Sequence, residues 1–450
     1  MYFDYTLLNP AFLFCAFFAL SLADGLFNYR SWEYDLGPKT VLVLSCGALV
    51  FLIVSVLTKE LYNRGILFKF RESTISRDES RGKVQLISVP DWLGWSNLLF
   101  SIAILGIVSK SLINLTAEWG SNGNLLNAIS IANTLNKFSD TGIEFPFIEA
   151  QLFVIVQASA FVWLYIIINN FISDRKSINI LTLSNVFVTI ISPLLTGSRG
   201  PFFMEIVAGV VIYYFLSNSS RTRDKKLVIK FTSIFSAIFV FLIIILLFRP
   251  LLSFMGRTDD TQGLFSYISI YLGGSIKNLD YYLSNPSSGR FSHVGTVRWG
   301  EVSFANLYEF IDSITGGSTN RQWAEWFPFQ SLGDVSFGNV YTVYYPFIRD
   351  WGIPGAISAI AVISFVSQFF FELVNAKIKN LTGTIRVSIL VYSIIEYGVI
   401  FCFFSNWISS TIINTLFIRF IIIWFLYSRL LNLLQPKDKR PVYQNKIGQV

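Results

Sequence analysis

The sequence predicts an all-α integral membrane protein, a polytopic bundle of about ten (10–12) transmembrane helices with one large loop. Of its 450 residues, 53% are hydrophobic and only 14% are charged, whereas soluble domains carry about 25% charged residues. The apolar residues also come in runs of about 20, the length that crosses the hydrocarbon core as a helix. These observations exclude a soluble enzyme, a disordered chain and a disulfide scaffold. No internal repeat is visible, so residues 1–450 are expected to form a single transmembrane domain.

The expected spans follow the apolar runs in order. The first run has no Lys or Arg before it and no small-residue cleavage end, so it is expected to be a retained span rather than a signal peptide. Between the seventh and eighth runs lies a loop of about 100 residues, 249–350, the largest piece outside the membrane. The ten spans are expected at about 9–27, 40–58, 91–110, 146–172, 179–196, 201–217, 231–248, 352–373, 386–404 and 411–430.

Lys and Arg are unevenly divided between the two alternating sets of connections. The set formed by 59–90, 173–178, 218–230, 373–386 and 429–450 holds 22 of them, whereas the far longer other set holds 12. Because basic residues are retained on the cytoplasmic side, the poorer set faces outward and both termini are cytoplasmic. The net charge of +7 then reflects loops that touch anionic membrane lipid. No basic groove in a soluble module is present, so no nucleic-acid partner is expected.

Two segments outside the spans have a helical apolar stripe. Residues 125–135 repeat apolar side chains at i, i+3, i+4 and i+7, which predicts a short helix lying on the outer surface. A second stripe covers 268–283 within the large loop, and Gly273-Gly274 is expected to interrupt it.

Metal and disulfide chemistry is not expected. The cysteines Cys15, Cys46 and Cys402 lie singly in apolar runs rather than in paired spacing. The chain holds one histidine, His293, and no His or Cys cluster, so neither a bound transition metal nor another cofactor is predicted.

Glu396 and Arg419 are the deepest charged residues within the predicted spans. Each lies about eight residues, or roughly 12 Å, below the outer ends of the last two spans. Charges inside a membrane are costly and pair with one another, so this matched depth predicts an ion pair. The pair either locks the two helices together or contacts substrate.

The sharpest local pattern is Thr196-Gly197-Ser198-Arg199-Gly200-Pro201 between the fifth and sixth spans. Gly197 and Gly200 suit a sharp reversal, and Pro201 suits the first turn of the next helix. Arg199 is not needed for the turn, and beside free backbone N–H groups it can bind an anion such as phosphate. The alternative is an interfacial arginine that reaches lipid phosphate. Arg249 lies at the same membrane surface, at the outer end of the seventh span.

The large loop is rich in arginine and aromatic residues. With Arg249 it holds six Arg against one Lys, among them Arg290, Arg298 and Arg321, and Arg binds phosphate and carboxylate through two parallel hydrogen bonds. Its tryptophans suit either sugar rings or a membrane interface. The candidate acid–base groups are Glu301, which follows Arg298-Trp299-Gly300 and is the first choice, then Asp312, Glu309 and His293.

A family resemblance follows from these motifs. The T-G-S-R-G-P-F-F run after a mid-chain span, followed by the large outer loop that ends in Gly338-Asn339-Val340-Tyr341-Thr342 and Asp350-Trp351-Gly352, resembles the O-antigen polymerases (oligosaccharide repeat unit polymerases, the Wzy family). The resemblance covers roughly residues 180–405. It implies a glycosyltransferase of the bacterial inner membrane that transfers a growing glycan from undecaprenyl pyrophosphate to a lipid-linked repeat unit on the periplasmic face.

The implied reaction needs two kinds of group. Cations must stabilise the departing pyrophosphate, and a carboxylate or histidine must take the proton of the acceptor hydroxyl. The implied partners are the undecaprenyl-pyrophosphate-linked oligosaccharide, membrane lipid and, as a further candidate, a chain-length regulator. Two other functions stay open at this point: an O-antigen ligase, which uses the same donor, and a lipid-linked oligosaccharide flippase or other transporter. A transporter is expected to have pseudo-symmetric halves and a midplane site, and the chain shows no such duplication.

Overall fold

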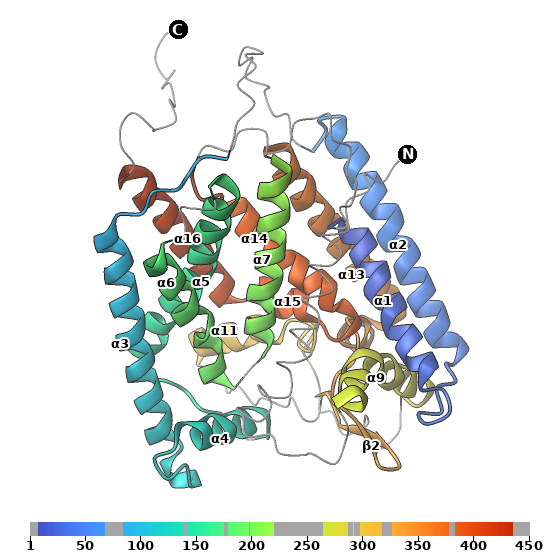
Figure 1. Cartoon of the computed structure of the whole chain (residues 1–450). Coiled ribbons are helices and arrows are strands. Elements are labelled where there is room, and N and C mark those ends of the chain that lie inside the picture. Colours follow the sequence, from blue (N-terminus) through green and yellow to red (C-terminus); the bar gives the residue numbers. More distant parts are fainter. Residues whose placement is uncertain are drawn as a thin grey trace.

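The structure is a computed structural model, and it describes the chain in ten segments. These are residues 8–67, 84–138, 142–174, 179–197, 199–219, 264–286, 291, 298–316, 326–377 and 383–434. Long helices run side by side in a bundle, and shorter elements lie at its lower end (Figure 1). The long helices are α1 (Pro10–Phe27), α2 (Pro38–Asn63), α3 (Asp91–Leu115), α5 (Phe147–Ser173), α7 (Gly200–Ser219), α13 (Tyr344–Lys377) and α16 (Thr415–Leu434).

These seven helices are long and apolar enough to cross a membrane. Two shorter apolar stretches accompany them: α6 (Ile180–Ile190) with the 3-10 turn η3 (Ser192–Thr196), and α14 (Val387–Ile400) with the 3-10 turn η5 (Phe401–Phe403). Every predicted span within the described residues therefore coincides with an apolar helix, which indicates a membrane-embedded protein. The seventh predicted span, 231–248, lies outside the described residues, so the count of ten stays a prediction.

Local sequence explains where several helices begin. Asn9 caps α1, since its side-chain oxygen accepts a hydrogen bond from the backbone N–H of Ala11 at 3.0 Å. Asn179 caps α6 in the same way. Pro10 and Pro38 occupy the first turns of α1 and α2, where a missing N–H costs no helical hydrogen bond.

Polar side chains link the helices inside the bundle. Ser55 of α2 donates to Oε1 of Gln368 in α13 at 2.6 Å. The indole N–H of Trp424 in α16 donates to the backbone oxygen of Ala158 in α5 at 2.9 Å. Because lipid tails are as apolar as these helices, such hydrogen bonds and close packing, rather than a hydrophobic driving force, hold membrane helices together.

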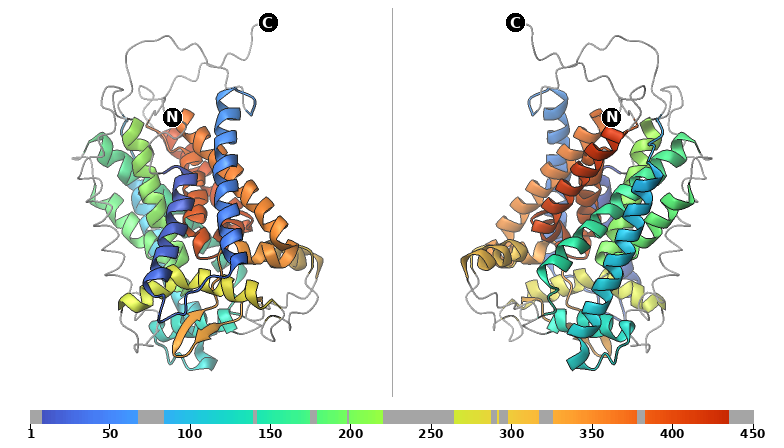
Figure 2. Two further views of the ribbon diagram at one scale, coloured as in Figure 1. Left: turned by 90° about the vertical axis from the view of Figure 1, so that its right-hand side faces the viewer. Right: turned by 90° about the vertical axis from the view of Figure 1, so that its left-hand side faces the viewer.

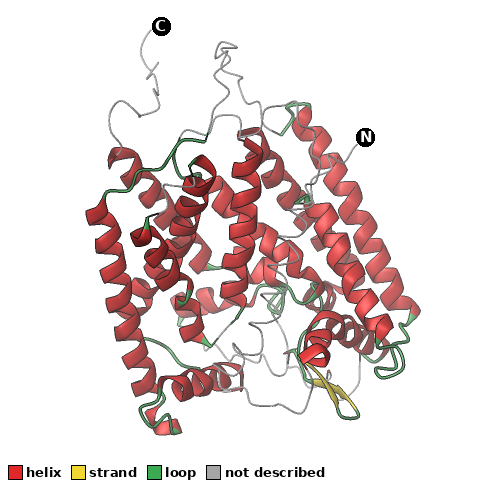
Figure 3. Ribbon diagram, viewed as in Figure 1, coloured by secondary structure: helices red, strands yellow, loops and turns green. Residues whose placement is uncertain are grey.

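The lower end of the bundle carries α4 (Leu125–Phe138), α9 (Leu264–Ser284), α11 (Ala305–Thr315) and a β-hairpin (Figures 1 and 2). The hairpin pairs β1 (Gln330–Leu332) antiparallel with β2 (Val335–Gly338), and it is the strand structure drawn in yellow in Figure 3. Apart from this hairpin, the described residues are helical or form loops and turns. The short helix α15 (Trp407–Ile412) lies between η5 and α16.

The helix predicted at 125–135 is confirmed as α4, and its place on the outer surface stays a prediction. Its Ala128, Ile129 and Ala132 are buried against the bundle. The second stripe is also helical, but the expected interruption at Gly273-Gly274 is wrong, because α9 continues through both glycines. They serve packing instead: a Cβ at Gly273 would lie 2.8 Å from Oδ2 of Asp24 in α1, so only glycine lets the two helices approach this closely.

The predicted start of the span at 352 is also refined. The helical segment begins at Tyr344 and changes direction at Gly352, whose φ of +69° is left-handed. Glycine adopts this conformation without steric cost. The D-W-G pattern thus marks a bend between a short buried piece and the long span.

Candidate functional site

The described residues of the T-G-S-R-G-P segment, Thr196, Gly197 and 199–201, lie at the expected turn at the lower end of α7. The 3-10 turn η3 ends on Gly197, which has a φ of +65°, and Pro201 lies in the first turn of α7. Both glycines are packed against protein: a Cβ at Gly197 would lie 2.8 Å from the Cβ of Asn133 in α4, and one at Gly200 would lie 2.8 Å from the ring of Trp407. Close packing therefore accounts for these glycines, and their expected contact with an anion stays a prediction.

Arg199 is half-buried and reaches the large loop. Its Nη2 donates a hydrogen bond to the hydroxyl of Tyr271 in α9 at 2.9 Å, and its guanidinium lies 5.1 Å from the centre of that ring. Tyr271 in turn stacks on Phe404, with 5.6 Å between ring centres. The tyrosine thus fixes the position of the arginine through both a hydrogen bond and a cation–π contact.

A pocket of about 400 Å³ opens beside this turn. Four stretches of the chain supply most of its lining: the first turn of α7, the segment 302–306, the second half of α14, and the stretch from Ser405 into α16. Phe327 and Pro346 complete it. Among the described residues, the lining carries no charged side chain. Its hydroxyl and amide groups come from Ser303, Asn306, Tyr397, Ser405, Asn406, Ser409, Ser410, Thr411 and Asn414. An uncharged pocket with hydroxyl and amide groups suits a neutral polar ligand rather than an ion.

Two buried polar groups of this lining are available to a ligand. Ser409 is 6% exposed, and its Oγ has no hydrogen-bond partner within the described ranges. The side chain of Ser303, which is 4% exposed, interacts with the Asp350 carboxyl instead. The indole N–H of Trp407 is also buried and has no hydrogen-bond partner among the described residues. Because a buried polar group without a partner costs roughly 1–3 kcal/mol, a ligand that supplies the missing hydrogen bonds is favoured here.

Hydrogen bonds from Ser303 and Asn306 hold the pocket wall in place. Nδ2 of Asn306 donates to the backbone oxygen of Ser410 at 2.6 Å, and the backbone N–H of Ser303 donates to Oδ2 of Asp350 at 2.7 Å. The loop segment is thereby attached to α15 and to the first piece of α13. Sequence reasoning missed this pocket entirely.

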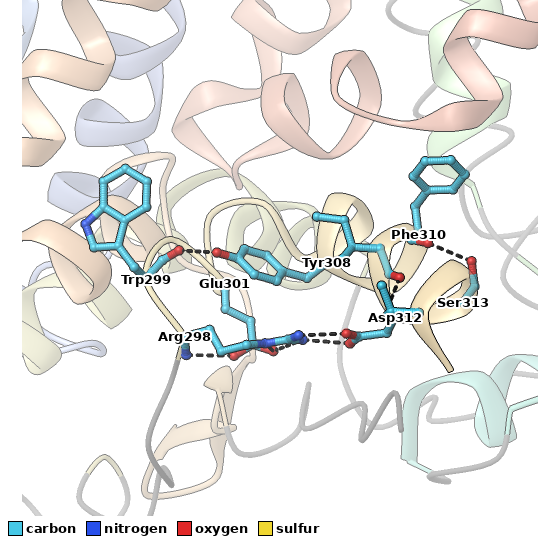
Figure 4. Close-up of polar contacts among 9 residues, drawn as sticks. Arg298, Trp299, Glu301, Tyr308, Phe310, Asp312 and Ser313 are labelled. Atoms are coloured by element: carbon cyan, nitrogen blue, oxygen red, sulfur yellow. Dashed lines mark hydrogen bonds and ion pairs between the residues drawn. The ribbon is translucent and has the colours of Figure 1, made fainter. Parts of the chain in front are cut away.

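The structure brings three predicted residues together: Arg298, Glu301 and Asp312 (Figure 4). Nη1 and Nη2 of Arg298 each lie 2.7 Å from one carboxylate oxygen of Asp312, and Nη2 lies 2.7 Å from Oε1 of Glu301. These hydrogen bonds raise the pKa of Arg298, and the bonds from Arg298 lower the pKa of the Asp312 carboxyl. Both carboxylates therefore neutralise the arginine, which makes Asp312 in particular a weak base.

The predicted Glu396–Arg419 ion pair is wrong. Glu396 is fully buried and its Oε2 accepts a hydrogen bond from the hydroxyl of Tyr392 at 2.6 Å. Arg419 points elsewhere, with Nη1 at 3.2 Å from Oε1 of Gln151 in α5 and Nη2 at 3.3 Å from the hydroxyl of Thr415. The two residues lie at matching depths along their helices, but their side chains contact different partners.

Several predicted site residues lie outside the described residues. These are His293, Arg249, Arg290 and Arg321. In the segments that are described, no group of three or more His, Cys, Asp or Glu is placed to hold a metal ion. The three cysteines are free thiols.

The chain was compared with known proteins at three levels. It matches no protein-family model, no curated protein and no solved structure.

Proposed function

We propose that this chain is a membrane glycosyltransferase that polymerises undecaprenyl-pyrophosphate-linked oligosaccharide repeat units into O-antigen or a related surface polysaccharide. The observation that carries the proposal is the uncharged pocket between the T-G-S-R-G-P turn and the loop segment 302–306. It joins the T-G-S-R-G-P turn, which carries one part of the family resemblance, to the large loop. The proposal includes a bacterial inner-membrane location, cytoplasmic termini and a periplasmic 249–350 loop.

In this proposal the pyrophosphate binds at Arg199. The residue next to it, Gly200, begins the 20-residue helix α7 and lines the pocket. A helix N-terminus offers free N–H groups and a partial positive charge, and the guanidinium is already positioned by Tyr271. Both favour the negative charge that develops as the pyrophosphate leaves. Arg249, Arg290 and Arg321 are further proposed phosphate or glycan contacts.

The sugar next to the pyrophosphate would occupy the pocket. Its hydroxyls can pair with the Oγ of Ser409 and the indole N–H of Trp407, and the ring of Trp407 offers an aromatic surface at the wall. An arrangement with the anion outside and the sugar inside explains why the pocket lacks charge.

The proposed proton acceptor is a carboxylate or a histidine of the large loop. Glu301 is the first candidate because Val302, the next residue, lines the pocket. In the structure its carboxylate contacts Arg298, so it must leave this ion pair to reach an acceptor hydroxyl. Asp312 and His293 are the other candidates.

Lipopolysaccharide gels distinguish the functions. Deletion of the gene should leave core plus one repeat unit if the chain is a polymerase. Loss of a ligase would leave no O-antigen on the core, and loss of a flippase would trap repeat units inside the cell; either pattern contradicts the proposal. The same strain tests the pocket: Ser409→Leu should fill it and give the one-repeat pattern, whereas Ser358→Leu on the exposed side of α13 should restore the ladder. Western blots should show equal protein levels for both variants.

A further inference from the structure

The helix α11 exposes an apolar stripe on one face. Leu307, Phe310, Ile311 and Ile314 follow the i, i+3, i+4, i+7 spacing, and their side chains are 38%, 44%, 40% and 67% exposed. Apolar side chains at this spacing normally face a protein core. Here they face away from the described protein.

The opposite face of α11 is attached to the protein by polar contacts. Asp312 pairs with Arg298, and the hydroxyl of Tyr308 donates to the backbone oxygen of Trp299. Figure 4 shows the Phe310 ring directed away from this ion pair. The helix is therefore oriented with its polar side inward and its apolar side outward, the reverse of a surface helix in a soluble protein.

The position of α11 relative to the spans indicates what covers the stripe. Figure 1 shows α11 lying roughly perpendicular to the long helices, and Figures 1 and 2 show it above the lower end of α3, at a level that this span crosses. Asn306 attaches its first turn to Ser410, a few residues before α16 begins. The apolar stripe thus lies at a level that the long helices cross.

The lipid-facing surface of α16 continues from this region. Apart from Arg429, its exposed side chains are apolar, and Ile418, Ile422, Phe425 and Leu426 are each 50–60% exposed. On the other side, Trp299 precedes α11 and its indole is 76% exposed. Tryptophan at such a place is typical of the level of the lipid headgroups.

We propose that α11 is an interfacial helix whose apolar stripe is inserted into the lipid leaflet on the side of the large loop. Helices with a polar and an apolar face lie in this way at the boundary between headgroups and acyl chains. The ion pair with Arg298 and the contact with Ser410 fix its rotation, so the stripe faces lipid and the pocket wall at Ala305 and Asn306 faces inward. This lipid contact is independent of the reaction that the protein catalyses.

Spin labels test the proposal in the full-length protein. In a background without cysteine (Cys15→Ser, Cys46→Ser, Cys402→Ala), nitroxides are attached at Phe310→Cys or Ile314→Cys on the stripe. Thr315→Cys, an exposed polar position outside the stripe, is the matched control. The variants are placed in nanodiscs of phosphatidylethanolamine and phosphatidylglycerol, and collisions with oxygen and with a water-soluble nickel complex are measured by power saturation.

The labels at 310 and 314 should collide with oxygen several times more strongly relative to nickel than the label at 315. Equal ratios at all three positions would mean that the stripe faces water and would overturn the proposal. Shielding of 310 and 314 from both reagents would mean that protein, such as a second copy of the chain, covers the stripe, and this result would also overturn it. The gel-filtration profile of each variant is compared with that of the cysteine-free protein. Only variants with the same profile enter the comparison.

Discussion

Arg298 and Asp312 form a bidentate ion pair: two guanidinium nitrogens each lie 2.7 Å from one oxygen of the same carboxylate. The pair joins α11 to the segment that leads directly into the pocket wall at Val302 and Ser303. The Arg298–Asp312 pair is thus connected to the position of the pocket wall. Planar, parallel geometry of this kind is specific to arginine.

Loss of this geometry should loosen α11 without unfolding the bundle. In Arg298→Lys the charge stays but the two parallel hydrogen bonds are lost. Amide exchange over 305–315 should accelerate by about fivefold or less, because Arg298 is half exposed and ion pairs that water reaches contribute little. Hydrogen–deuterium exchange with mass spectrometry measures this effect. Exchange in α5 provides the control and should not change. Unchanged exchange in α11 would show that the pair does not hold the helix.

The attachment of α11 should also depend on pH in a defined direction. Hydrogen bonds from Arg298 lower the pKa of Asp312 below its ordinary value of 3.8, so the carboxylate stabilises the folded contact above 3.8. That contribution disappears only as the pH falls through the lowered pKa. A spin label at Thr315→Cys should stay equally immobile from neutral pH to about pH 4 and become mobile below it. Asp312→Asn should be mobile throughout and show no such transition; a transition above pH 5 would contradict the assignment.

Arg199 should be essential for polymer formation. If pyrophosphate binds at Arg199 as proposed, Arg199→Ala removes a charge-assisted contact that strengthens as the leaving group departs. We expect this loss to cost about 3 kcal/mol, or about a hundredfold in rate. Arg199→Lys should rescue only in part because it lacks the fork. Tyr271→Phe keeps the ring under the guanidinium but removes the hydroxyl, so it should lose less than Arg199→Ala. A full O-antigen ladder from Arg199→Ala at normal protein level would refute the role.

The sequence was sufficient to predict features that depend on local composition. The apolar spans follow from run length, α4 from the spacing of Ala128, Ile129 and Ala132, and the turn before α7 from its Gly and Pro. The pocket was not predictable in this way. Ser303 and Asn406 are about 100 positions apart, and they meet because the loop docks on α15, where Nδ2 of Asn406 lies 3.4 Å from the backbone oxygen of Ser303.

The Glu396–Arg419 prediction failed for a related reason. Residue counting gives the depth of a side chain in a span, but not the direction in which it points around the helix axis. The partner of Glu396 is Tyr392, four residues earlier on the same helix, and residues at i and i+4 are neighbours on any helix surface. The sequence contained this closer partner, whereas the rotation of α16 depends on its packing against α5.

The separate partners of Glu396 and Arg419 lead to a thermodynamic test. Glu396→Gln and Arg419→Gln should each destabilise the protein, and their effects should add within about 0.5 kcal/mol because they belong to different contacts. Tyr392→Phe should cost about 1–3 kcal/mol by leaving the buried carboxyl without this hydrogen bond. Unfolding in mixed detergent micelles, followed by circular dichroism, gives the free energies. If the double variant were as stable as either single variant, the result would show that Glu396 and Arg419 are paired.

The close approach of Gly197 to α4 should matter more than its left-handed conformation. Gly197→Ala places a Cβ 2.8 Å from the Cβ of Asn133 and 3.1 Å from the backbone oxygen of Ile129, so α4 must move. Gly120→Ala is the matched control, because Gly120 is also left-handed, with a φ of +87°, and has no atom within 4 Å of an added Cβ. The backbone strain common to both variants is about 1–2 kcal/mol, so Gly197→Ala should be the less stable variant, with the melting temperature in detergent as the measure. In addition, amide exchange in α4 should rise only in Gly197→Ala; equal melting temperatures and equal exchange would show that strain alone accounts for the glycine.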